Sequence, residues 1–99
     1  AVVVIDNERY GETGMQDTHT RHGVDLSGIA TAAGIRRSFI VYEEEELDTL
    51  IPELYNRDGP IFATIKVTAA SHPTVLPARD GSYLKSRFRQ ALLGDKAAE

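Results

Sequence analysis

The first residues able to do chemistry follow directly after an apolar run. Val2 to Ile5 is β-branched and continuous, which predicts a strand, and Asp6 and Asn7 end it. Asn7 offers a neutral amide oxygen, and the backbone carbonyl of Arg9, two residues later, can point into the same space. Two such oxygens suit a hard divalent cation that also holds diphosphate oxygens. An ordinary polar turn after a strand is the alternative interpretation of the same residues.

The segment that follows is long and irregular. Residues 6–24 are rich in Gly, Thr, Asp, His and Arg and show no helical or strand periodicity, so they are expected to form a loop. Irregular loops of this length inside a compact domain are usually functional or mobile. Gly11 and Gly14 would let the backbone of this loop bend freely or approach a ligand closely.

The remaining chain alternates helices and strands. Apolar residues at helical spacing predict a helix over 26–33, with Asp25 as N-cap and Gly34 just past its end. A second helix follows the acidic run 43–46, and Pro52 predicts a kink in it or two short helices. The other expected elements are strands at 38–42 and 61–67, a loop at 69–77, a helix at 83–92 ended by Gly94, and a frayed tail at 95–99.

This order predicts an α/β fold, a three-layer αβα arrangement around a parallel sheet. Continuous apolar character at 2–5 favours a strand covered on both faces. Because three strands make a thin sheet, we expect residues 1–99 to be part of one domain of a longer chain, with further strands upstream. In open parallel sheets ligands bind outside the carboxyl ends of the strands, where Asn7 lies.

Composition narrows the function classes. The 99 residues carry 11 Lys and Arg against 15 Asp and Glu, a formal net charge of −4, which argues against a nucleic-acid partner. No apolar run is long enough to span a membrane, and no membrane partner is expected. Zero cysteines exclude disulfides and thiolate chemistry, and are compatible with a cytoplasmic location.

The opening string VVVIDNERYGETGMQ resembles the second half of the thiamine-diphosphate-binding motif, which begins Gly-Asp-Gly and ends Asn-Asn after an apolar strand. Its Tyr-Gly-x-Thr-Gly-x-Gln continuation, residues 10–16, is most similar to the sulfopyruvate and phosphonopyruvate decarboxylases. Weaker similarities in the later segments extend the resemblance over most of the chain. Asp6 stands where the family often has its first Asn, and the Gly-Asp-Gly half, which carries a third metal ligand, is absent from this sequence.

The resemblance implies part of the thiamine-diphosphate-binding fold, with thiamine diphosphate and Mg²⁺ as cofactors. Asn7 would ligate Mg²⁺ through its side chain and Arg9 through its main-chain oxygen. The cofactor-binding residues implied are Asn7, Arg9, Tyr10, Gly11, Thr13 and Gly14. The reaction implied is non-oxidative decarboxylation of a small 2-oxo acid. A glutamate from a pyrimidine-binding domain or subunit would activate the cofactor, so a homo- or hetero-oligomer is expected, and the chain alone is expected to be inactive.

Within that reaction, chemistry and position rather than the motif single out further residues. Glu12, His19 and His22 are candidate proton carriers. Arg9 and Arg21 are candidates for attracting the anionic tail of a substrate such as a phosphonate or sulfonate. Asp17 with the two histidines also has the spacing of a transition-metal site, although polar surface is the commoner role of such residues. Tyr10 is expected in the core rather than over the cofactor.

Two alternatives stay open at this point. An acetolactate-synthase-like carboligase would use the same cofactor. A non-catalytic α/β module serving only subunit association would need no cofactor.

Overall fold

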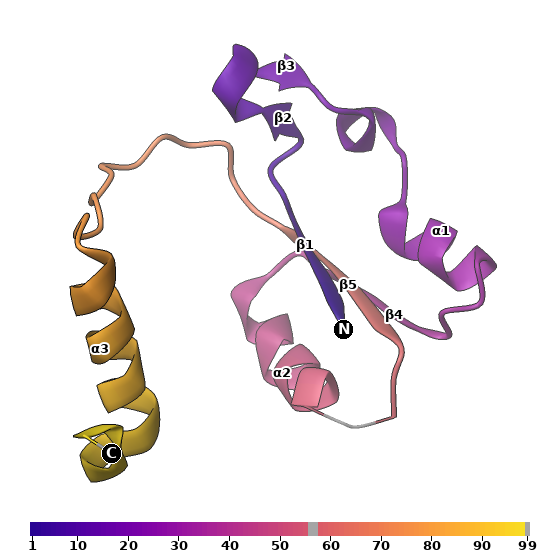
Figure 1. Cartoon of the computed structure of the whole chain (residues 1–99). Coiled ribbons are helices and arrows are strands. Elements are labelled where there is room, and N and C mark those ends of the chain that lie inside the picture. The colour runs from indigo at the N-terminus through magenta and orange to yellow at the C-terminus, as the bar shows by residue number, and fades with distance from the viewer. Residues whose placement is uncertain (56–57, 99) are drawn as a thin grey trace.

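The computed structural model describes residues 1–55 and 58–98, which form a small α/β fold (Figure 1). The strands are β1 (Val2–Asp6), β2 (Arg9–Tyr10), β3 (Gln16–Asp17), β4 (Arg37–Val41) and β5 (Ile61–Lys66). The α-helices are α1 (Leu26–Ala32), α2 (Leu47–Tyr55) and α3 (Gly81–Leu93). Short 3₁₀ helices are η1 (Gly11–Thr13), η2 (His19–His22), η3 (Glu44–Glu46) and η4 (Gly94–Ala98).

A three-stranded parallel sheet in the order β1-β5-β4 forms the centre of the fold. Helices α1 and α2 lie on opposite sides of it (Figure 1), as the alternation of strands and helices predicts. On the α2 face, Leu50 packs with Val41 and Ala63 to form the core. The predicted α/β class with a parallel sheet is therefore confirmed.

Strand β1 occupies an edge of this sheet, which the sequence did not predict. Val2, Val3 and Ile5 are 51%, 42% and 62% exposed, so the expectation of a strand covered on both faces is wrong. The buried central strand is β5, because the strand order in the sheet places it between β1 and β4. Val3 and Ile5 are paired in register with Ala63 and Ile65, so they extend the α2 face beyond α2.

Helix α1 is fixed to the opposite face by hydrogen bonds as well as by apolar contact. The Asp25 carboxylate accepts from the Gly28 N–H at 2.9 Å, which confirms the predicted N-cap. Gly34 follows the helix with φ of 98°, the left-handed conformation expected of a residue past a helix end. The Ser27 hydroxyl donates to the Phe39 carbonyl at 2.6 Å and lies 3.0 Å from the Thr64 hydroxyl.

Helix α2 continues through Pro52, so it is not divided there. The change of helix type instead lies between η3 and α2, where Glu43 and Glu46 form a capping box. Packing of the apolar side of α2 against the sheet, centred on Leu50, stabilises the helix in spite of the proline.

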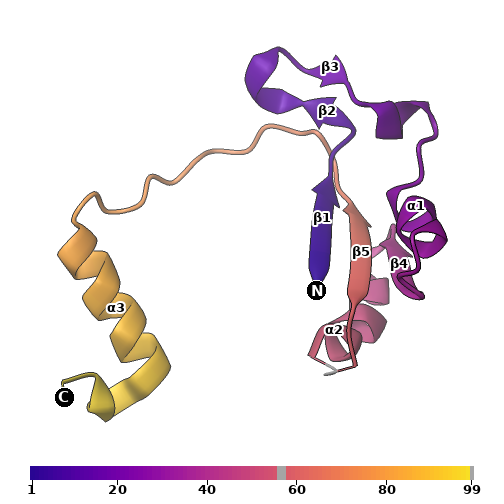
Figure 2. The same cartoon turned by 45° about the vertical axis from the view of Figure 1, so that its right-hand side comes forward.

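Helix α3 stands apart from the sheet at the end of an extended segment, residues 67–80 (Figure 2). Its N-cap Asp80 accepts from the N–H groups of Ser82 and Tyr83 at 2.9 and 3.1 Å, so it begins two residues before the predicted start. The Cα radius of gyration is 17.8 Å, against about 13 Å for a compact chain of this length. Residues 95–98, which the sequence predicts to be a frayed tail, belong to η4, whereas Glu99 lies outside the described residues.

The segment 6–24 is also more ordered than a loop. It contains a two-stranded antiparallel hairpin, β2 with β3, and the two 3₁₀ helices η1 and η2. Glu8, Gly14 and Met15 all take positive φ. Because the chain reverses at these residues, its short elements are too brief to give a periodic pattern in the sequence.

Candidate functional site

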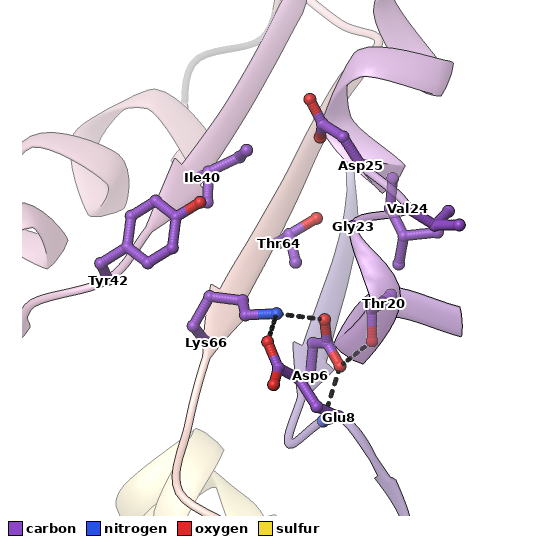
Figure 3. Close-up of a pocket in the computed structure, with 11 residues that line it drawn as sticks. Asp6, Glu8, Thr20, Gly23, Val24, Asp25, Ile40, Tyr42, Thr64 and Lys66 are labelled. Carbon is purple, nitrogen blue, oxygen red and sulfur yellow. Dashed lines mark hydrogen bonds and ion pairs between the residues drawn. The ribbon is translucent and has the colours of Figure 1, made fainter. Parts of the chain in front are cut away.

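A cleft of about 230 Å³ opens where β1, β4 and β5 end (Figure 3). This is the carboxyl edge of the sheet, where the sequence predicts a ligand site. Six polar side chains line the cleft together with apolar ones. They are Asp6, Glu8, Thr20 and Asp25 on one side, and Thr64 and Lys66 on the central strand β5, with Ile40 and Tyr42 on the opposite side.

Lys66 is the centre of the polar side of the cleft. It ends β5 and is paired in register with Asp6 of β1, so the two side chains emerge side by side. Its Nζ lies 2.9 Å from Asp6 Oδ2 and 2.5 Å from Glu8 Oε1. Thr20 donates to Asp6 Oδ1 at 2.8 Å, and Arg21 pairs with Glu8 Oε2 at 3.2 Å. Figure 3 shows Lys66 reaching across the mouth of the sheet to both carboxylates.

The backbone reverses sharply directly after β1. Glu8 has φ of 60°, a conformation that residues with a Cβ seldom adopt. Two successive Asx turns form the reversal: Asp6 Oδ1 accepts from the Glu8 N–H at 2.9 Å, and Asn7 Oδ1 from the Arg9 N–H at 3.0 Å. The Asn7 amide oxygen is therefore held beside the cleft, although Asn7 does not line it.

Asp6, Glu8, Lys66 and Arg21 form one cluster of paired charges. Burial raises the pKa of Asp6, but hydrogen bonds from Lys66, the Glu8 N–H and Thr20 outweigh it and hold that pKa below its ordinary value. Hydrogen bonds from Lys66 and Arg21 lower the pKa of Glu8. Burial lowers the pKa of Lys66, but hydrogen bonds to Glu8 and Asp6 outweigh it and raise that pKa above its ordinary value. Asp6 and Glu8 are consequently negative and Lys66 positive at neutral pH, and the Arg21 guanidinium paired with Glu8 completes the balance of charge.

The hairpin above the cleft holds the predicted cofactor-binding residues. Tyr10 is 53% exposed, so its expected place in the core is wrong, because the hairpin projects away from the sheet. Gly11 begins η1, and Gly14 ends it with φ of 118°. The Thr13 hydroxyl donates to the Gln16 side chain at 3.1 Å. None of these four residues lines the cleft, and Gly14 and Thr13 serve the turn itself.

The predicted proton carriers and substrate anchors are spread over the same hairpin and η2. Glu12, His19 and His22 are exposed and do not line the cleft. Arg9 forms an ion pair with Asp17, and Arg21 forms one with Glu8, so both guanidinium charges are compensated.

The alternative of a transition-metal site finds no support. His22 Nε2 lies 3.4 Å from Asp17 Oδ2. Within residues 1–55 and 58–98, however, no three His, Cys, Asp or Glu side chains are grouped so that they could hold a metal ion.

Asn7 nevertheless fits part of a Mg²⁺ site. An amide oxygen has two lone pairs, and the bond from the Arg9 N–H uses one of them. Neutral oxygens suit a cation whose charge is already balanced by a diphosphate. The carboxylates of Asp6 and Glu8, on either side of Asn7, are engaged by Lys66, so ligands other than Asn7 and the Arg9 main-chain oxygen would have to come from the diphosphate or from groups other than these two carboxylates.

Most residues that line the cleft were not predicted from the sequence to be functional. Lys66, Thr20, Tyr42 and Thr64 were not singled out, and Asp6 was noted only as a departure from the motif. A signal for Lys66 was present, because a charged residue ends the otherwise apolar stretch 61–65. Its pairing with Asp6 depends on the strand order, which no local pattern reveals.

Comparisons with protein-family models, with curated proteins and with solved structures found no match to this chain. Among the described residues, no helix is both long and apolar enough to cross a membrane.

Proposed function

We propose that this chain is the diphosphate-binding part of a thiamine-diphosphate- and Mg²⁺-dependent enzyme that decarboxylates a small 2-oxo acid such as sulfopyruvate or phosphonopyruvate. The observation that carries the proposal is the Asx turn at the end of β1. It holds the Asn7 amide oxygen on the Arg9 N–H at 3.0 Å, at the carboxyl edge of a parallel sheet. This geometry adds to the resemblance of residues 2–16 to the thiamine-diphosphate-binding motif.

The charge balance of the site supports a cation-dependent mode of binding. Asp6 and Glu8 compensate Lys66 and Arg21, so the cluster offers no net positive charge to an anion. A diphosphate would therefore gain little from the protein side chains alone, and a divalent cation would have to join the two.

In this proposal the residues of the chain hold and orient the cofactor. Asn7 and the main-chain oxygen of Arg9 would bind Mg²⁺, and the glycine-containing hairpin of Tyr10, Gly11, Thr13 and Gly14 would lie against the cofactor. When bound, thiamine diphosphate supplies the electron sink for the carbon–carbon bond that breaks as CO₂ leaves.

The hairpin and η2 would serve the substrate. Glu12, His19 and His22 are exposed, and in this proposal they would carry protons to the product. A sulfonate or phosphonate tail would have to compete with Asp17 for Arg9 and with Glu8 for Arg21.

The test is calorimetric titration of the whole protein with thiamine diphosphate, with and without Mg²⁺. Asn7→Ala should weaken Mg²⁺-dependent binding about 10-fold or more, because a metal ligand is lost. Asn7→Asp is the matched control, since its carboxylate can still accept from the Arg9 N–H and bind the cation. Equal affinity of Asn7→Ala and the wild type, or binding that ignores Mg²⁺, would count against the proposal.

A second candidate, subunit association, is favoured by the exposed apolar side of α3. Phe88 and Leu92 are 67% and 68% exposed and lie one helical turn apart. Val3 and Ile5 leave a second apolar patch uncovered on the α2 face of β1. In this candidate function, α3 of one copy covers that patch on a second copy.

Charge complementarity agrees with this pairing. Helix α3 carries Lys85, Arg87 and Arg89 and no acidic residue. Glu43 and Glu44, from the acidic run 43–46, line a hollow together with Ile65 and Val67, and Ile65 is the strand partner of Ile5 in the β1 patch. Sedimentation velocity over a range of concentrations tests the idea, with a dimer expected. A monomer at every concentration would refute it.

A further inference from the structure

We propose that Lys66 is a positioning residue that holds the Asn7 turn in the conformation able to bind Mg²⁺. The inference rests on the proposed function, and it concerns a residue on a different strand, 59 positions away from Asn7 along the sequence (66 − 7). Its ammonium binds the side chains of Asp6 and Glu8 rather than those of Asn7 and Arg9. It acts on the residues on both sides of Asn7.

The first step is that Lys66 binds the residues immediately before and after Asn7. One ammonium binds Asp6, immediately before Asn7, at 2.9 Å and Glu8, immediately after it, at 2.5 Å. Lys66 itself is set by the parallel register that pairs it with Asp6 at the end of the rigid central strand β5. The turn is thereby tied to the sheet at two consecutive points around the proposed ligand.

The second step is the backbone of Glu8. Its φ of 60° is unfavourable for a residue with a Cβ and persists only where surrounding contacts impose it. The contacts that impose it are the Glu8 N–H donated to Asp6 and the Glu8 carboxylate held by Lys66 and Arg21. The reversal at Glu8 is what brings the Arg9 N–H to within 3.0 Å of Asn7 Oδ1.

It follows that loss of the ammonium should release Glu8 toward ordinary φ values. The Arg9 N–H would then leave Asn7, and the amide oxygen would lose its fixed direction. Residues that orient a metal ligand typically change metal affinity by about 10- to 100-fold when they are removed.

The experiment measures amide hydrogen exchange and Mg²⁺-dependent thiamine diphosphate binding on the whole protein. Lys66→Met should speed exchange of the Arg9 amide at least tenfold and raise the Mg²⁺ concentration for half-saturation at least tenfold. Lys66→Arg keeps a cation and should retain much of both. Lys96→Met, at an exposed position of η4, is the matched control and should change neither.

A rescue separates positioning from general stabilisation. Glycine adopts positive φ freely, so Glu8→Gly in the Lys66→Met background should restore slow Arg9 exchange and much of the Mg²⁺ affinity. No rescue would overturn the proposed role of the Glu8 backbone. If Lys66→Met also exposes the amides of β5, Glu8→Ala provides the test, because it removes the side chain that Lys66 binds at a partly exposed residue.

The outcomes distinguish failure of the positioning role of Lys66 from failure of the proposed function. Slow Arg9 exchange in Lys66→Met would overturn the positioning role whatever the ligand. Fast exchange with unchanged Mg²⁺ dependence would overturn the link between the turn and the metal. If the wild type binds no thiamine diphosphate at all, the proposed function fails, and the exchange data still decide whether Lys66 holds the turn.

Discussion

The hydroxyl pair that joins α1 to the sheet offers a quantitative test of the structure. Ser27 and Thr64 are each 4% exposed, and their hydroxyl oxygens lie 3.0 Å apart. Ser27 donates its proton to the Phe39 carbonyl at 2.6 Å, so Thr64 must be the donor within the pair. This bond anchors α1, and with it the chain that leads from the Asn7 turn to Asp25 at the cleft.

The order of donors predicts unequal effects. Ser27→Ala leaves the buried Thr64 hydroxyl without an acceptor and should lower the free energy of unfolding by about 1–3 kcal/mol. Thr64→Val leaves Ser27 with its bond to Phe39 and should cost about 0.5–1.5 kcal/mol. In the Ser27→Ala background, Thr64→Val removes an unsatisfied hydroxyl, so it should cost nothing or stabilise.

The assay is a double-mutant cycle by urea unfolding of the chain. The expected coupling is about 1–2 kcal/mol, well above the ~0.5 kcal/mol within which independent sites add. For a domain of this size, 1 kcal/mol corresponds to about 4–8 °C in Tm, so thermal unfolding can check the result. Additive effects of the two substitutions would refute the hydrogen bond and the packing of α1 against the sheet inferred from it.

Two further predictions concern the cleft and α3. The lowered pKa of Asp6 means that its contribution to stability is complete above about pH 4 and is lost as pH falls through the folded-state value. Acid titration of unfolding should therefore show a steeper loss below pH 4 in the wild type than in Lys66→Met, and equal slopes would contradict the ion pair. Phe88→Asp, at an exposed position of α3, should raise the dissociation constant of the proposed dimer at least tenfold, since burying one Phe contributes about 1.5–3 kcal/mol. Sedimentation velocity measures this change, circular dichroism confirms that helix content is retained, and an unchanged dissociation constant would exclude α3 from the interface.

Local patterns in the sequence were enough to locate the strands and helices of the sheet region. Interactions between residues close in sequence determine these elements. Examples are the N-cap at Asp25, the left-handed Gly34 and the helical spacing around Leu50. The turn after β1 was likewise visible as Asp6-Asn7, because Asx residues bond their own backbone two positions on.

Long-range arrangement was beyond such patterns. That β5 lies between β1 and β4, that β1 forms an exposed edge, and that Tyr10 points to solvent depend on which segments meet in space. The same holds for Lys66, whose partners Asp6 and Glu8 lie about sixty residues earlier in the chain. Hydrophobic periodicity reports which residues prefer burial, but the pairing of strands is decided by the packing of the whole chain, and the cleft exists only once that pairing is made.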